Sequence, residues 1–311
     1  MRYVLRKIIS SSITLFVIVS LTFVLMHLIP GGPFDSERKL PDSIVKNLNA
    51  RYNLDKPLRE QYIIYIKNVL TGDLGPSIKY ENKTVNSIIK EGFPVTAAIG
   101  VAAIFLAVFV GSLLGVAAAI YRQRWPDYAA SIISTLGISV PGFILAGFLV
   151  YLFAFRLGWF PPALWDGPKS MALPVLSLAW FPTAIIARLM KSSVLEVLNQ
   201  EYIKTARAKG LPMSYIVIQH VLRNAAAPMI SYVGPALATI LTGSFVIENI
   251  FALPGLGKWF VLSISNRDYT VILGLTIFYS TLLIVLNILV DLVLAVLDPR
   301  IRYTKAKGAG L

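Results

Sequence analysis

Six long apolar segments, almost free of charged residues, constrain this chain of 311 residues more than any other feature. They span residues 9–29, 95–121, 128–155, 171–187, 229–247 and 271–297. Because an α-helix rises about 1.5 Å per residue, each segment is long enough, or nearly so, to cross a hydrocarbon layer of about 30 Å. Only 14% of the residues are charged, well below the share of about a quarter in soluble domains. The sequence therefore predicts an all-α, polytopic membrane protein with six transmembrane helices.

The placement of the basic residues predicts which side of the membrane each connection faces. With the N-terminus in the cytoplasm, the inner connections hold 15 Lys and Arg residues against four acids. The outer connections hold 14 against 11, but ten of those 14 lie in the long segment 30–94, and long translocated segments escape the positive-inside rule. We therefore expect both termini to be cytoplasmic, with +11 of the net charge of +13 on that side. Since no basic stretch is interleaved with aromatic residues, nucleic acid is not an expected partner.

The apolar segments divide the chain into four parts. These are a cytoplasmic tail with the first transmembrane helix (1–29), an extracytoplasmic loop region (30–94), a transmembrane core (95–297) and a cytoplasmic tail (298–311). Helix-compatible stretches at 41–50 and 57–70 favour a small folded cap in the loop region over a mobile linker. The core contains a cytoplasmic loop, 188–228, that is too long for a bare connection between helices.

The composition argues against an enzyme or a metalloprotein. The chain has no cysteine, which excludes disulfides, thiolate metal sites and iron–sulfur clusters. Its two histidines, His27 and His220, form no cluster that suggests a metal site or a proton relay. The sequence has no Gly-x-x-x-x-Gly-Lys-Ser/Thr phosphate loop, so it offers no such route to ATP binding. We expect no catalytic residue, cofactor or metal in this chain.

The cytoplasmic loop 188–228 breaks into two helical pieces around a glycine. The first piece, 196–209, is amphipathic. Its two faces hold Tyr202, Ile203 and Ala206, and Lys204, Arg207 and Ala208. Gly210 suits the position after a helix and Pro212 cannot continue one, so a second piece follows at 213–227. Two interpretations remain open: a helix lying on anionic lipid headgroups, or a helix that inserts into a groove of a cytosolic partner.

This loop makes the chain recognisable through the stretch EYIKTARAKGLP at 201–212, followed by Arg223-Asn224 and Pro228. The stretch resembles the cytoplasmic loop of ABC-importer permeases, specifically their peptide and nickel branch. The general motif of that superfamily is Glu-Ala-Ala, three residues, then Gly. This chain keeps Ala206 and Gly210 but has Lys204 and Thr205 in the first two places, as the peptide branch commonly does.

Further stretches along nearly the whole chain look like the B-type subunit of oligopeptide importers. They are LIPGGPF at 28–34, ER at 37–38 with LP at 40–41, GPS at 75–77 with KY at 79–80, LPGLG at 253–257, NRDY at 266–269 and DPRIRY at 298–303. Within the branch, Pro-Phe-x-x-Glu-Arg-x-Leu-Pro and Gly-Pro-Ser-x-Lys-Tyr favour an oligopeptide system over a dipeptide or nickel system.

The resemblance implies a type I ABC importer permease fold in a bacterial cell membrane, with a second, related permease subunit beside this one. It also implies two cytosolic ATPases, which bind ATP and Mg²⁺, and an extracytoplasmic protein that delivers the peptide. The residues that would couple this chain to an ATPase are Glu201, Tyr202, Thr205, Ala206, Arg207, Lys209 and Gly210. We expect Ala206 and Gly210 to be small because the helix sits in a partner cleft. We expect Arg207 and Lys209 to pair with partner acids or, in an interfacial helix, with lipid phosphate.

Polar residues in or beside the membrane segments are few. Asn287 and Asp291 are four residues apart, hence on one helix face, and an acid inside a span must face protein or water. They are candidates for the peptide path or a gate, although a structural pairing of Asp291 with Arg188 or another inner base is the favoured interpretation. Glu248 and Asn249 are better placed to meet a substrate, and capping of the next short segment is an equal alternative.

Small residues and prolines mark sites of helix packing and bending. Gly111 and Gly115 form a small-x-x-x-small face, which is typical of close helix packing on either a partner permease or a neighbouring span. Pro141-Gly142, Pro182 and Gly234-Pro235 are expected to kink or loosen their helices.

Two other classes of membrane protein compete with an ABC permease. A secondary transporter would show two similar halves and midplane ion-binding residues, and the sequence has no convincing internal repeat. A scaffold that only anchors cytosolic proteins would need the inner loop but no polar pathway. Copurification with ATPases and ATP-dependent uptake of a labelled peptide would separate these classes.

Overall fold

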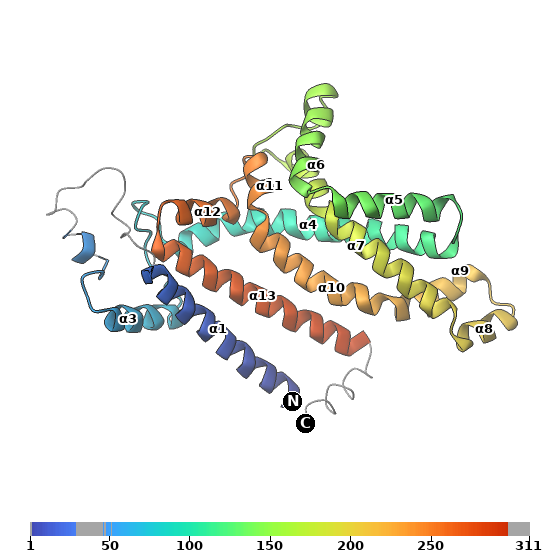
Figure 1. Cartoon of the computed structure of the whole chain (residues 1–311), viewed down its shortest axis with the longest axis horizontal. Coiled ribbons are helices and arrows are strands. Elements are labelled where there is room, and N and C mark those ends of the chain that lie inside the picture. Colours follow the sequence, from blue (N-terminus) through green and yellow to red (C-terminus); the bar gives the residue numbers. More distant parts are fainter. Residues whose placement is uncertain (1, 29–45, 47, 51, 298–311) are drawn as a thin grey trace. The chain divides into compact units, whose positions relative to one another are not determined.

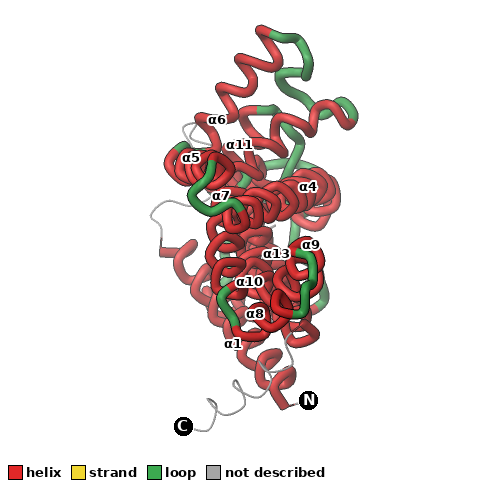
Figure 2. The backbone as a smooth tube through the Cα atoms, turned by 90° about the vertical axis from the view of Figure 1, so that its right-hand side faces the viewer, coloured by secondary structure: helices red, strands yellow, loops and turns green. Residues whose placement is uncertain are grey.

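The computed structural model describes residues 2–28, 46, 48–50 and 52–297, and their regular structure is helical (Figures 1 and 2). The chain divides into two compact units. Unit 1 comprises Met1–Val95 and Pro254–Leu282, and unit 2 comprises Thr96–Leu253 and Leu283–Leu311. The C-terminal tail, the LIPGGPF stretch after Leu28 and most of the predicted helix 41–50 lie outside the described residues.

Five helices among the described residues are long and apolar enough to cross a membrane. They belong to α1 (Arg2–Leu28), α4 (Val85–Ile120), α7 (Ala172–Leu198), α10 (Leu222–Gly243) and α13 (Tyr269–Leu297). The short α9 (Met213–Ile216) and a π-helical turn (Val217–Val221) lead directly into α10. A sixth span results if the bent pair of α5 and α6 is counted as one, so the predicted all-α, polytopic fold is confirmed.

Two helices extend beyond the apolar segments because helical backbone continues past polar residues and proline. α4 begins at Val85 and passes through Pro94, so the end of the predicted loop region 30–94 is helical. α7 runs on to Leu198, although the apolar segment stops near 187. Its last three turns are amphipathic and bury Met190 and Val194 against the protein. Within the predicted loop 188–228, residues 199–212 separate α7 from α9.

The third apolar segment is bent much more sharply than a kink. α5 (Trp125–Ser139) and α6 (Gly142–Leu149), which continues as a π-helical turn (Val150–Arg156), form an angle of 105°. Val140 and Pro141 between them are extended, with ψ of 114° and 140°. Proline lacks the N–H that a helix needs and disfavours helical backbone in the residue before it. Pro141 therefore ends one helix and begins the next.

Unit 1 packs the described part of the segment between α1 and α4 against long apolar helices. Phe23 and Met26 of α1 lie in one buried cluster with Tyr269 and Ile272 of α13, and Tyr62 and Tyr65 of α3 (Leu58–Leu70) pack against it. The hydroxyls of Ser20 and Tyr62 are 2.5 Å apart, which joins α1 to α3. A second cluster joins the start of α4 to α12 (Leu256–Ser265) and α13. Residues 52–84 thus belong to a folded cap, as the sequence predicts.

The buried Asp268 holds two distant stretches of unit 1 together. Its carboxylate accepts hydrogen bonds from Ser77 Oγ, from Ile78 N at 3.2 Å and from Val271 N in the first turn of α13 at 3.3 Å. A cap of this kind contributes about 1–2 kcal/mol. Gly75 has a φ of +86°, and a Cβ there would lie 2.8 Å from Thr270 Cγ2. The GPS and NRDY stretches, nearly 200 residues apart, are therefore one structural feature.

Unit 2 is built on close contacts between α4 and α7. A Cβ at Gly111 would lie 2.8 Å from the Thr183 carbonyl oxygen, and one at Gly115 would lie 2.5 Å from that of Ala187. Between two helices in a membrane, small residues permit this approach and the dispersion contacts that follow from it. The neighbouring span α7, within the same chain, is thus what these glycines contact.

We expect Gly115→Ala to lower the melting temperature of the purified protein, because its methyl group would lie 2.6 Å from Met190 Cβ. Overpacking of this kind costs about 1–3 kcal/mol. Gly147→Ala is the matched control, since a Cβ on this exposed glycine of α6 meets nothing within 4 Å. Equal melting temperatures for the two variants would contradict the α4–α7 contact.

Candidate functional site

The connection after α7 forms a separate short helix, α8 (Glu201–Ala208). The single amphipathic stretch predicted at 196–209 is wrong. α7 ends at Leu198, and Gln200 has an extended backbone with ψ of 147°, which redirects the chain before α8 begins. Figure 1 shows α8 and α9 together at one end of α7.

One face of α8 is buried in the core of unit 2. Ile203 is fully buried and Ala206 is 8% exposed, in a cluster with Met190 and Val194 of α7 and Ile216 of α9. Tyr202, predicted on the same face, is 46% exposed. Its hydroxyl instead accepts a hydrogen bond of 3.3 Å from the Asn224 side chain of α10. The apolar face is narrower than the sequence suggests, and a tyrosine at its edge is joined to α10.

The end of α8 has the hydrogen bonds of a Schellman motif. Gly210 N donates to Arg207 O at 2.9 Å, and Leu211 N donates to Ala206 O at 3.3 Å. Gly210 has a φ of +78°, in the left-handed region that favours glycine, while a Cβ there would meet nothing within 4 Å. The predicted stop at Gly210 and Pro212 is therefore found, and it sets the direction in which α9 leaves.

Contacts within this chain explain the small size of Ala206 and Gly210, which were expected to be small in order to fit a partner. Ala206 is small because its side chain packs against the core of unit 2. Gly210 is glycine because of its backbone angle, as the space around it is open. The small size of these two residues therefore does not require a partner cleft. The exposed surface of α8 is formed by other residues.

The exposed face of α8 carries mostly positive charge. Lys204 Nζ lies 2.7 Å from Glu201 Oε1, but both side chains are largely in solvent, so this ion pair contributes little. Thr205 Oγ1 donates to the Glu201 carbonyl within the helix. Arg207 and Lys209 are exposed and make no ion pair with any residue that the structure describes. The anchored helix and the residue that follows it thus expose Thr205 and two cations, Arg207 and Lys209, that form no ion pair with a described residue.

Glu248, which the sequence offers equally as a substrate contact or as a cap of the next short segment, is buried. It lies in α11 (Phe245–Ile250) and is 1% exposed. Its Oε1 accepts hydrogen bonds from Thr96 Oγ1 of α4 at 2.9 Å and from Ser244 Oγ at 2.6 Å. The carboxylate therefore joins the start of α11 to α4, an arrangement that no local pattern reveals. Asn249, the next residue, is exposed.

For the polar residues of α13, a role in the peptide path or in a gate stays a prediction. Asn287 and Asp291 are both half-buried in unit 2. Arg188, the suggested partner of Asp291, donates to Thr135 Oγ1 of α5 at 3.2 Å. Sequence reasoning missed the ion pair that does form near this end of α7, between Lys191 and the buried Asp127 of α5.

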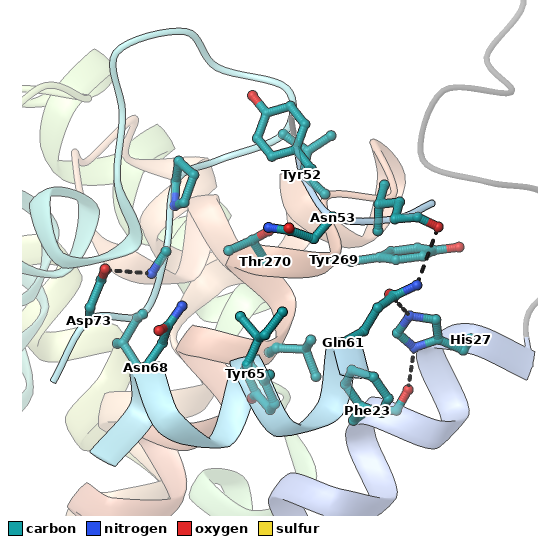
Figure 3. Close-up of a pocket in the computed structure, with 17 residues that line it drawn as sticks. Phe23, His27, Tyr52, Asn53, Gln61, Tyr65, Asn68, Asp73, Tyr269 and Thr270 are labelled. Atoms are coloured by element: carbon teal, nitrogen blue, oxygen red, sulfur yellow. Dashed lines mark hydrogen bonds between the residues drawn. The ribbon is translucent and has the colours of Figure 1, made fainter. Parts of the chain in front are cut away.

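Unit 1 contains a separate pocket of about 160 Å³ between α1, α3, α13 and the segment 73–78 (Figure 3). At its rim His27 Nε2 lies 3.2 Å from Gln61 Oε1, and Gln61 Nε2 donates to Lys56 O at 2.8 Å. Asp73 Oδ1 accepts from Gly75 N at 2.9 Å. The hydroxyl of Tyr65 is buried without a hydrogen-bond partner among the described residues, and this burial raises the pKa of Tyr65. The fold thus gathers polar and aromatic side chains from separate parts of unit 1 around one pocket.

Comparison with known proteins identifies the family of this chain. Residues 111–303 match the binding-protein-dependent transport system inner membrane component, and residues 1–100 match the N-terminal model for the same kind of membrane component. The chain belongs to this permease family. The first match contains α7, α8 and α10, so the helix α8 lies within the matched family region.

Relatives in the permease family match over nearly the whole chain. The dipeptide transport system permease protein DppB of Bacillus subtilis (strain 168) is 52% identical over 304 residues, which cover 98% of this chain and 99% of that protein. The oligopeptide transport system permease protein OppB of Haemophilus influenzae is 44% identical, with 97% and 100% covered. That of Escherichia coli (strain K12) is 43% identical, also with 97% and 100% covered.

Solved structures show the same permease fold. A chain of the MetNI methionine ABC transporter, in an inward-facing conformation, has a TM-score of 0.54 at 18% identity and covers 68% of this chain and 96% of its own. A chain of an amino acid ABC transporter crystallised with histidines has a TM-score of 0.51 at 15% identity, with 69% and 94% covered. The predicted type I ABC importer permease fold is confirmed.

We expect Ala206→Leu to displace α8 from the core, because its side chain has no room beside Ile203 and α7. The expected loss is about 1–3 kcal/mol, seen as a lower melting temperature and faster proteolysis near residues 199–212. Ala208→Leu adds the same atoms to an exposed position of the same helix and serves as the control. If both variants resist proteolysis equally, the buried face of α8 is assigned incorrectly.

Proposed function

We propose that this chain is a membrane-spanning subunit of an ATP-driven ABC importer for peptides. The names of full-length relatives at 43–52% identity, all permeases of peptide transport systems, carry this proposal. In it, the chain pairs with a second permease subunit, and together they enclose the pathway. Two cytosolic ATPases supply the energy, and an extracytoplasmic protein delivers the peptide.

The helix α8 is the point at which we place contact with an ATPase. Anchoring by Ile203, Ala206 and the Schellman turn makes α8 move as one body with α7 and α9. Its exposed Arg207 and Lys209 suit acids on a cytosolic partner. When the ATPase dimer closes on ATP, a lever of this kind transmits the motion to the spans without bending. The transition is then a change between two discrete packings, biased by the nucleotide state of the partner.

In this proposal ATP and Mg²⁺ are bound by the partner subunits and not by this chain, whose sequence lacks a phosphate loop. The distribution of basic residues supports cytoplasmic termini, which puts α8 on the side where ATP is available. The membrane is then a bacterial cell membrane, and the outer cap with the pocket of Figure 3 lies on the side from which peptide arrives.

The proposed cargo is an oligopeptide, and a dipeptide is the alternative. The outer-loop motifs GPS with KY and ER with LP support an oligopeptide system. The higher identity of 52% to a dipeptide permease supports the alternative. Selection by the separate binding protein would make the permease permissive, so both cargos fit this chain.

The double change Arg207→Glu and Lys209→Glu is expected to lower peptide-stimulated ATPase activity and uptake by at least tenfold in the reconstituted importer. Charge reversal turns attraction to partner acids into repulsion, which costs several kcal/mol at an interface. Lys169→Glu, at an exposed lysine before α7, is the control for loss of positive charge. Stimulation at the level of the unchanged protein would remove α8 from the coupling contact.

Uptake into proteoliposomes tests the class of transporter and the cargo together. We expect labelled pentapeptide to accumulate only when ATP is supplied to the ATPase side, with no effect of an ionophore that collapses ion gradients. Uptake driven by an ion gradient without ATP would instead indicate a secondary transporter. A labelled dipeptide run in parallel decides the cargo, because preferential dipeptide uptake overturns the oligopeptide assignment and leaves the ABC mechanism in place.

A further inference from the structure

A cavity of about 320 Å³ in unit 2 lies between α4, α5 and α7, near the end of α7 that leads to α8. Its polar lining consists of two cations and four hydroxyl-bearing residues. They are Arg188, Lys191, Ser131, Ser134, Thr135 and Ser192. Hydroxyls and cations can both donate hydrogen bonds, so the lining is suited to a ligand that accepts them.

The charges around this cavity leave one cation uncompensated. Lys191 is paired with Asp127, whose other oxygen accepts from Gln123 N at 3.0 Å. Arg188 is exposed, and its described hydrogen bond is the single one to Thr135. No carboxylate among the described residues pairs with it. A guanidinium has five N–H donors, so most of those of Arg188 remain available for an anion.

The surface beside the cavity is apolar and bears interfacial aromatic residues. Trp125, Tyr128, Ile132 and Leu136 are all exposed and follow each other at helical spacing along α5. Tryptophan and tyrosine are favoured where lipid headgroups meet hydrocarbon. Because α5 also supplies Ser131 and Thr135 to the cavity, the hydroxyls lie next to this apolar stripe on the same helix. An anion that carries hydrocarbon chains therefore fits both surfaces.

Further basic residues raise the local attraction for anions. Arg122 and Arg124 are exposed in the turn between α4 and α5, close in sequence to Asp127 and Trp125. Each Lys or Arg near an anionic membrane surface contributes about 1 kcal/mol to binding. The predicted topology places this end of α7 on the cytoplasmic side, where such residues accumulate.

We propose that the cavity binds the phosphate of an anionic phospholipid, with Arg188 as its main ligand and the hydroxyls of α5 and Ser192 around it. The acyl chains would then lie along the stripe from Trp125 to Leu136. A bound lipid would fill the space between α5 and α7 just before the coupling segment. The site depends on the membrane and not on the cargo, so it stands or falls independently of peptide transport.

Native mass spectrometry of the intact importer, titrated with dioleoylphosphatidylglycerol, tests this site. Arg188→Gln is expected to weaken phosphatidylglycerol binding about fivefold, the effect of one basic residue. Arg156→Gln is the matched control: Arg156 is also exposed in unit 2 and donates one hydrogen bond of 2.9 Å, to Tyr151. Equal weakening by both variants would mean general attraction of charge and would overturn the site.

Two further arms separate the possible ligands and guard against misfolding. Ser192→Leu places apolar atoms in the cavity without changing its charge, and it should weaken phosphatidylglycerol binding while the complex still elutes as one assembled species. Dioleoylphosphatidylcholine, whose headgroup is neutral overall, should bind weakly and respond to neither variant. Equal affinity for both lipids overturns the proposal. Displacement of phosphatidylglycerol by inorganic phosphate alone assigns the cavity to a free anion and overturns the lipid source.

Discussion

Hydrocarbon offers the backbone no hydrogen bonds and gives apolar helices little reason to associate, so membrane helices depend on close mutual approach. Gly111 and Gly115 supply that approach between α4 and α7. Buried alanines in the core of unit 2, including Ala103, Ala107 and Ala179, extend this close contact along the two helices. α7 is thereby fixed along the part that leads to α8, so the position of α8 is fixed as well.

The proposed coupling helix α8 is a continuation of this packing. Ile203 and Ala206 place α8 in the same buried cluster as Met190 and Val194, so the helix is part of the core and not a flexible loop. A lever that transmits force needs such an anchor, because a helix held only by its ends would absorb a partner's motion. The residues that anchor α8 and the residues that it exposes are therefore different, although they alternate within eight positions.

Sequence reasoning succeeded where one local property decides the outcome. Apolar length predicted the spans, and glycine followed by proline predicted the end of α8 at Gly210. It failed where a choice depends on a distant partner. Tyr202 was placed on one face with Ile203 and Ala206, whereas it is 46% exposed and its hydroxyl accepts a hydrogen bond from Asn224 of α10. For Glu248 the sequence left a substrate contact and a cap of the next short segment equally open, and only the fold shows that Thr96 of α4 donates a hydrogen bond to its carboxylate.

The sequence by itself determined that this chain is a helical membrane protein of the permease family, because apolar length and the motif at 201–212 are properties of contiguous residues. The tertiary structure alone decided that Ala206 faces inward, that Gly115 contacts α7 and that Ser77 meets Asp268. Each of these contacts joins residues from separate elements. Their pairing depends on how helices approach in space, which hydrophobic periodicity along one helix does not encode.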